Sequence, residues 1–170
     1  MEIIRQRKVE RDDWQRLPDD HDVGAGGIPA RGRLIVPLQV LLDHPGLVTG
    51  RRAPTGVLLG PADEVEALAS YLDDIALVAI EFPTFTEGRG YSQARLLRER
   101  DRFRGEIRAL GDVSRDRLAF MERCGFDTFA LRPGETPEQA LAAFTEIVPR
   151  YQPAADPGDT VKARRAATVA

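Results

Sequence analysis

Short apolar runs alternate with segments of helical periodicity along the chain after residue 32. Five runs, each bounded by Gly, Pro or Asp, predict β-strands at 33–38, 55–60, 75–82, 105–109 and 127–131. Parallel strands need a crossover, and the connections between these runs are long enough to contain helices. The alternation therefore predicts βα units around a mainly parallel sheet, so the expected fold class is α/β.

Helical spacing marks the segments that connect the strands. Apolar residues recur at i, i+3, i+4 and i+7 from Val65 to Leu72, which gives one helix face. A second helix is predicted around 94–97, with Ser92 as its cap, and a third over 113–124, with Asp112 as its N-cap. Each helix is expected to bury its apolar face against the sheet.

The strongest helix signal follows the last predicted strand. Thr136 is a typical N-cap, Pro137 suits the first helical position, and Gln139 completes a capping box. An apolar stripe then runs from Leu141 to Val148. This pattern predicts one continuous helix.

The domain organisation follows from where the periodicity begins and ends. Residues 1–32 predict an N-terminal arm or edge hairpin with a loop, 33–151 a single α/β core, and 152–170 a disordered tail with few large apolar residues. Charged residues within the strands, such as Glu81, Glu106 and Arg108, favour a partial (β/α) barrel or curved open sheet. A flavodoxin-like open sheet is the alternative.

Composition removes several classes of function. The chain has 170 residues and a formal net charge of −3, which gives no global attraction to nucleic acid or an anionic membrane. It has one cysteine and two histidines, so a multi-cysteine metal site is not expected, and no cofactor motif is visible. No apolar run predicts a membrane helix or signal peptide, so we expect a cytoplasmic protein without metal or cofactor.

The clearest site signal is the loop after the third predicted strand. Gly88 and Gly90 would let backbone N–H groups turn inward, Arg89 would add a forked cationic donor, and a helix starting near Ser92 would favour negative charge. This combination predicts binding of a small oxyanion. The alternative is that the glycines make the turn and Arg89 pairs with Glu87.

Charged residues on the fourth predicted strand and the preceding helix provide further anion ligands. Glu106 and Arg108 share one strand face, and Glu81 on the neighbouring strand is a possible partner of Arg108. Arg108 either binds a ligand or neutralises buried carboxylates. Arg95 and Arg98 share one helix face, where one points to the cleft while the other pairs with Glu99 or meets solvent.

Three carboxylates are catalytic candidates. Asp112 and Asp116 lie one helical turn apart and would be able to bind a cation or transfer protons, and Glu87 belongs to the glycine-rich loop. The alternative is that Asp112 and Asp116 merely complement a helix dipole.

Several motifs resemble those of a known bacterial family. They are Phe82-Pro83-Thr84-Phe85, Gly88-Arg89-Gly90-Tyr91-Ser92, Gly105-Glu106-Ile107-Arg108-Ala109 and Arg123-Cys124-Gly125-Phe126-Asp127. The chain resembles the family known as domain of unknown function 934, most densely over 74–131. The resemblance implies a link to assimilatory sulfite reductase genes and an oxidoreductase label. The chain departs from the family pattern at Glu87, where aspartate is usual, and at Arg117, where glutamine is usual.

Two hypotheses follow. The chain is an accessory protein of assimilatory sulfite reduction that binds sulfite reductase or a sulfur oxyanion, with Arg89, Arg95 and Arg108 as ligands. Alternatively, it is a barrel-like enzyme in which Arg89 and Arg108 orient an anionic substrate while Glu87, Asp112 or Asp116 transfers protons. An apolar surface around Phe85 and Tyr91 would favour a docking role. A homodimer would cover exposed sheet edges.

Overall fold

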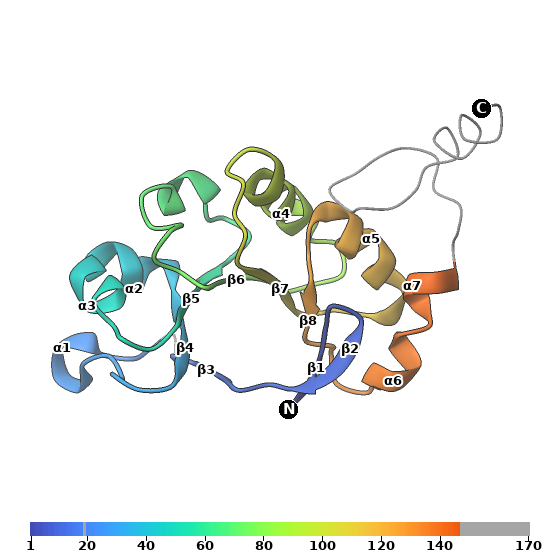
Figure 1. Cartoon of the computed structure of the whole chain (residues 1–170), viewed down its shortest axis with the longest axis horizontal. Helices are drawn as coiled ribbons and strands as arrows, with labels where there is room; N and C mark the ends of the chain where they lie inside the picture. Colours follow the sequence, from blue (N-terminus) through green and yellow to red (C-terminus); the bar gives the residue numbers. More distant parts are fainter. Residues whose placement is uncertain (19, 147–170) are drawn as a thin grey trace.

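Eight strands form one curled sheet in the computed structural model, which describes residues 1–18 and 20–146 (Figure 1). The strands are β1 (Glu2–Arg5), β2 (Lys8–Arg11), β3 (Trp14–Arg16), β4 (Arg33–Pro37), β5 (Thr55–Leu59), β6 (Leu77–Phe82), β7 (Glu106–Gly111) and β8 (Thr128–Phe129). Their spatial order is β2-β1-β8-β7-β6-β5-β4-β3. Four of the five apolar runs singled out in the sequence contain one of these strands, and the run 105–109 overlaps β7, which continues to Gly111.

The sheet is mixed. Each pairing from β3 through β8 is parallel, whereas β1 lies antiparallel to both β2 and β8. Because β3 to β8 follow one another in space as in sequence, right-handed crossovers place their connections on the same face. A flavodoxin-like sheet reverses its strand order and carries helices on both faces, so that alternative is wrong. The barrel-like prediction is confirmed as a curled half-barrel.

The N-terminal segment determines the curl. The two edge strands, β2 and β3, are separated in sequence by only Asp12 and Asp13. Seven strand spacings across a flat sheet would hold the edges about 34 Å apart, whereas the chain from Arg11 to Trp14 spans at most about 11 Å. The sheet must therefore bend until the extended run 8–16 bridges its open side, below the strands in Figure 1.

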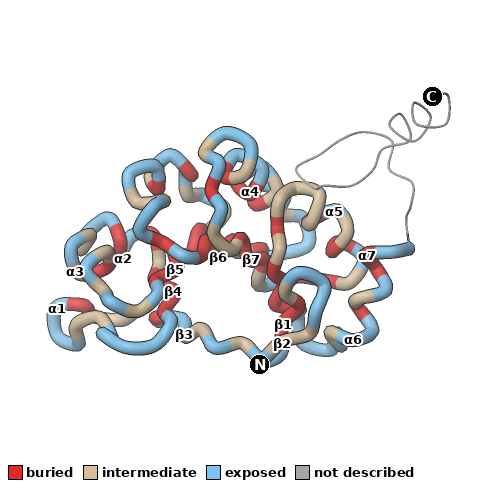
Figure 2. The backbone as a smooth tube through the Cα atoms, in the orientation of Figure 1, coloured by how far each residue is buried: buried red, intermediate tan, exposed pale blue. Residues whose placement is uncertain are grey.

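Helices and turns cover the convex face (Figure 1). They are α1 (Val23–Gly26), α2 (Leu38–Asp43), α3 (Pro45–Thr49), α4 (Arg89–Glu99), α5 (Leu118–Cys124), α6 (Pro137–Ala140), α7 (Ala143–Glu146) and the 3₁₀ turns η1 (Val65–Leu68) and η2 (Arg115–Arg117). Strand residues such as Val57, Ile80 and Ile107 are fully buried with Leu97 and Met121 of the helices in the main core. Burial is therefore greatest in the central strands, whereas the edge strands β2 and β3 and the outer faces of the helices are more exposed (Figure 2).

A second apolar cluster lines the concave face. It contains Ile35, Leu58, Leu77 and Ala79, against which Trp14 of β3 packs. These residues alternate along their strands with residues of the main core, as expected for a sheet buried on both faces. The bridging run 8–16 thus helps to close the concave interior.

Three predicted helices are wrong in extent. The helix predicted over 113–124 divides into the 3₁₀ turn η2 and the shorter helix α5. The apolar face from Val65 to Leu72 forms only the turn η1, because Ser and Asp between 70 and 74 favour turns over a continued helix. The helix predicted after Thr136 begins at Pro137 as expected, but Thr136 makes no side-chain cap bond. It divides into α6 and α7, where Phe144 N–H donates to Leu141 in a three-residue pattern. Val148 and the predicted tail lie outside the described residues.

Candidate functional site

A buried ion-pair network occupies the concave interior. Arg108 on β7 is 2% exposed; its Nη1 donates to both Asp12 carboxylate oxygens at 3.0 Å, and its Nε donates to Glu106 at 2.8 Å. Glu106 also lies 3.2 Å from Arg5, which donates to Glu10 at 2.7 Å. The two guanidinium groups therefore alternate with three carboxylates in one continuous row of ion pairs.

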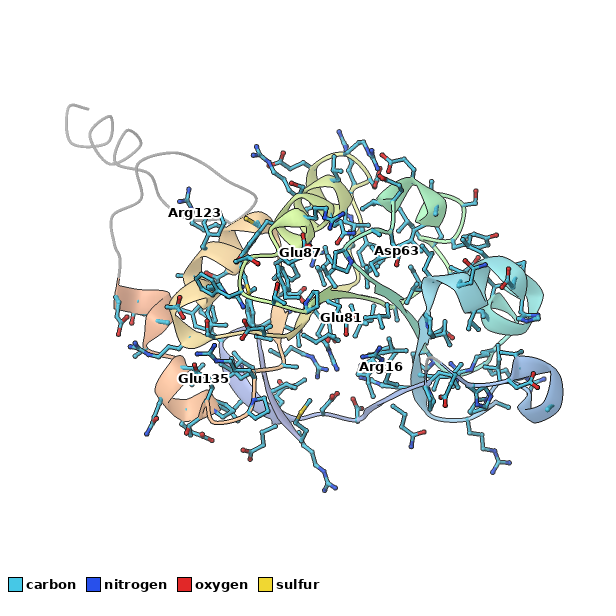
Figure 3. The ribbon with its side chains drawn as sticks, turned by 180° about the vertical axis from the view of Figure 1, so that it is seen from behind. Arg16, Asp63, Glu81, Glu87, Arg123 and Glu135 are labelled. Atoms are coloured by element: carbon cyan, nitrogen blue, oxygen red, sulfur yellow. The ribbon has the colours of Figure 1, made fainter. Side chains whose placement is uncertain are left out.

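The predicted partner of Arg108 is wrong, although Glu106 and Arg108 do share a strand face. The β6–β7 register places Ala79 opposite Arg108 and Leu110 opposite Glu81. Glu81 instead accepts a bond of 3.4 Å from Arg16 of β3 (Figure 3). Since an anion at Arg108 would compete with Asp12 and Glu106, anion binding there stays a prediction.

The glycine-rich loop places a carboxylate of the protein itself at the start of α4. Glu87 accepts hydrogen bonds at 3.0 Å from the backbone N–H and from Nε of Arg89. The Arg89 guanidinium holds the pKa of Glu87 below its usual value. The carboxylate thus occupies the position at which a small anion would meet the helix start. Anion binding by Arg89 and Gly88 stays a prediction.

Two other residues of this loop have roles in α4. Ser92 lies inside the helix, because α4 begins at Arg89 with Gly88 as its N-cap, so the predicted cap at Ser92 is wrong. Gly90 is buried, and a Cβ there would lie 2.6 Å from Cζ of Phe82. Glycine at this position lets α4 approach the end of β6 closely.

The helical arginines are held by other residues. Arg95 donates to Glu99 at 2.9 Å, one turn further along the exposed face of α4. Arg98 donates to the Asp127 carboxylate at 2.8 Å and to the carbonyl oxygens of Gly125, Phe103 and Gly105. Arg98 therefore ties α4 to the amino end of the sheet, and an anion-binding role for Arg95 stays a prediction.

The two aspartates after β7 have separate partners. Asp112 accepts a hydrogen bond at 3.1 Å from Arg132, and the N-cap of the next turn is Ser114, so the predicted cap at Asp112 is wrong. The strand reaches Gly111, whose φ of +94° turns the chain before a cap at Asp112 is possible. Asp116 is exposed, and Ser114 holds its pKa below the usual value. Proton transfer by either aspartate stays a prediction.

The structure adds Arg117, which the sequence marked only as a departure from the family pattern. Arg117 ends η2 at the carboxyl side of β7 and is 7% exposed. Its guanidinium carbon lies 5.6 Å from the ring centre of Phe82 and 5.2 Å from that of Phe85. Nη1 donates to the Phe85 carbonyl over 3.5 Å. Within the described residues, Nε and Nη2 are buried and have no hydrogen-bond partner.

The two aromatic contacts do not offset the free-energy cost of burying Arg117 donors without hydrogen bonds. A cation–π contact contributes about 0.5–2 kcal/mol, whereas one unpaired buried donor costs about 1–3 kcal/mol, and more when it is charged. Arg117 has two such donors among the described residues, and the exposed carboxylate of Asp116 interacts with its charge only at longer range. The site therefore favours an additional hydrogen-bond acceptor.

Aromatic side chains form a surface above Arg117. Phe85 is 62% exposed and Phe120 is 55% exposed, and Tyr91 lies between the buried Phe82 and Phe120 at ring-centre distances of 5.2 and 5.1 Å. Burial raises the pKa of Tyr91, and both the positive charge of Arg117 and a side-chain hydrogen bond between Tyr91 and Arg117 oppose that shift. We call Phe85, Tyr91 and Phe120 the aromatic patch. It lies where the β6–α4 loop, α4 and α5 meet.

The sequence also matches the model of a protein family. The family is described as "Bacterial protein of unknown function (DUF934)", and the match covers residues 56–161. The chain belongs to this family. The match includes the aromatic patch, Arg117 and strands β5 to β8. Comparison with curated proteins gives no significant match.

No helix within the described residues is long and apolar enough to cross a membrane. The predicted cytoplasmic location and homodimer stay predictions.

Proposed function

We infer that this DUF934 protein is an accessory factor of assimilatory sulfite reduction that acts by docking to sulfite reductase. The aromatic patch is the observation that carries the proposal. Exposed aromatic side chains are enriched at protein interfaces because they supply large contact areas with few rotatable bonds. The assignment to this pathway rests on the family resemblance, which implies a link to assimilatory sulfite reductase genes.

The charges around the patch fit a docking role. The nearby charged residues Arg89, Arg95 and Arg132 each pair with a neighbouring carboxylate of the same chain. Such pairs remain solvated at an interface rim and contribute mainly to orientation. The aromatic patch would then supply most of the contact energy.

A genetic experiment tests the pathway. A strain that lacks the gene should grow poorly with sulfate as the sulfur source and normally with cysteine, and the parent chain should restore growth on sulfate. Normal growth of the deletion strain on sulfate would refute the proposed pathway.

A binding experiment tests the docking surface. The tagged chain should co-purify sulfite reductase from sulfate-grown cells, and Phe120→Ser should reduce the recovered reductase at least tenfold. Leu42→Ser is the matched control, because Leu42 is 40% exposed on α2, away from the patch. Equal recovery with Phe120→Ser and the parent would exclude the patch as the docking surface.

A further inference from the structure

The unpaired donors of Arg117 have a defined geometry. Nε and Nη2 are the two nitrogens along one side of the guanidinium fork, and both lack a partner among the described residues. Their N–H groups point in nearly parallel directions, which matches the two oxygens of one carboxylate. The third nitrogen, Nη1, is occupied by the Phe85 carbonyl.

The surface above these donors is apolar. Phe85 lies over the guanidinium, and Tyr91 and Phe120 continue the aromatic surface along α4 and α5. Phe85 is itself largely exposed, and its carbonyl contact to Arg117 is 3.5 Å long. A small rotation of Phe85 would therefore open a path from solvent to Nε and Nη2.

We propose that Arg117 is the anchor of a site for a carboxylate on a partner protein, with an adjacent aromatic side chain of the partner packed on Phe120 and Tyr91. This inference rests on the proposed docking function and specifies what the surface recognises. The buried cation selects the carboxylate, and the patch selects the apolar group beside it. Phe85 covers Arg117 in the free protein and moves aside on binding.

The two halves of the site favour a protein segment over a small inorganic anion. Sulfite, sulfate or phosphate would meet the Arg117 fork but would leave the aromatic patch uncovered. An aromatic amino acid with a free carboxylate, as at a chain terminus, would engage both. Two small probes that differ only in the carboxylate separate its contribution to binding from that of the aromatic ring.

The test is a nuclear magnetic resonance titration of the full chain with N-acetylphenylalanine and with N-acetylphenylalaninamide. The acid should shift the Arg117 Nε–H signal and the aromatic signals of Phe120, and the amide should bind at least tenfold more weakly. Equal binding of acid and amide would overturn the proposal. Sulfite or sulfate binding at least as tightly as the acid would also overturn it, in favour of a small-oxyanion site.

Two substitutions test whether the acid binds at Arg117. Arg117→Gln keeps a polar side chain of similar length and should weaken binding of the acid at least tenfold, with an unchanged circular dichroism spectrum. Arg104→Gln is the charge-matched control, because Arg104 is exposed just before β7, and it should bind like the parent. Binding of the acid to Arg117→Gln with the parent affinity would remove Arg117 from the site.

Growth and titration separate this inference from the function on which it rests. If Arg117→Gln restores growth on sulfate whereas Phe120→Ser does not, the docking function stands and the carboxylate anchor is wrong. If the deletion strain grows normally on sulfate, the pathway is wrong, and the titration alone decides whether Arg117 binds a carboxylate.

Discussion

Arg108 and Arg117 are both buried, yet the protein treats their charges in opposite ways. Arg108 faces the concave interior, where Asp12 and Glu106 accept its hydrogen bonds. Arg117 lies at the carboxyl side of the sheet between two phenylalanine rings, with two donors unused within the described residues. The chain pairs the first charge with its own carboxylates, although Nη2 of Arg108 makes no hydrogen bond within the described residues, and it leaves the second charge open to an outside acceptor.

The difference separates a structural charge from a binding charge. A buried ion pair need not stabilise a protein relative to apolar residues, but removing one partner leaves the other charge buried and unpaired. Arg108 has such partners, because its loss would leave Asp12 without a cation and Glu106 with Arg5 alone. Asp116 interacts with the charge of Arg117 but is exposed to solvent, so the loss of Arg117 should affect recognition more than folding.

Arg108→Met tests the largest expected effect. The substitution leaves Asp12 and Glu106 without their main cation, so we expect the free energy of unfolding to fall by about 3–5 kcal/mol. Urea denaturation followed by circular dichroism measures the change. Arg104→Met, at an exposed position, should change the free energy by less than about 0.5 kcal/mol. Equal effects of the two substitutions would show that the interior network does not hold the fold.

Arg117→Met should have a much smaller effect on stability. The substitution loses two cation–π contacts but also removes two unpaired buried donors, so the free energy of unfolding should remain within about 1 kcal/mol of the parent. The same denaturation experiment applies. A loss as large as that of Arg108→Met would contradict the comparison, because it would mean that Arg117 also holds the structure together.

The smallest effect concerns the pair Glu87–Arg89 at the start of α4. Arg89 lowers the folded-state pKa of Glu87, so the pair stabilises the fold above the unfolded pKa of Glu87, and this contribution is lost as the pH falls through the lowered value. A carbon-detected titration should place the Glu87 midpoint below that of an ordinary glutamate. In Arg89→Ala the midpoint should return towards the usual value. An unchanged midpoint would mean that the pair is not maintained in solution.

Hydrophobic periodicity was sufficient to predict strands β4 to β8 of the parallel part of the sheet, but not β3. The apolar runs before Pro37, Gly60 and Pro83 lie in central strands, whose burial on both faces gives a clear local signal. The N-terminal strands were harder to place, because the pairing of Arg5 with Thr128 depends on residues far apart in sequence. Local patterns indicated the hairpin but not its pairing with β8.

The candidate site was less predictable for a related reason. Residue types identified Glu87 and Arg89 as neighbours, and the alternative that they pair with each other describes their contact in the structure. Asp12 carried no local sign that it would meet Arg108, 96 residues away. The aromatic enclosure of Arg117 likewise brings the end of β6 and the loop after it against η2, more than thirty residues further along the chain. Such sites depend on tertiary packing, which no local spacing encodes.

The bridge formed by residues 8–16 also sets an order of events during synthesis. The β1–β2 hairpin is made first, but its partner strand β8 appears more than a hundred residues later. At about 5–20 residues per second, the hairpin waits roughly 6–25 s for that strand. Strands β3 to β7 can pair with their neighbours as they emerge, whereas joining the hairpin closes a long loop at an entropic cost of about 4 kcal/mol. The oldest part of the growing chain is therefore the last to join the sheet, and the outer edge of β8 stays unpaired until it does.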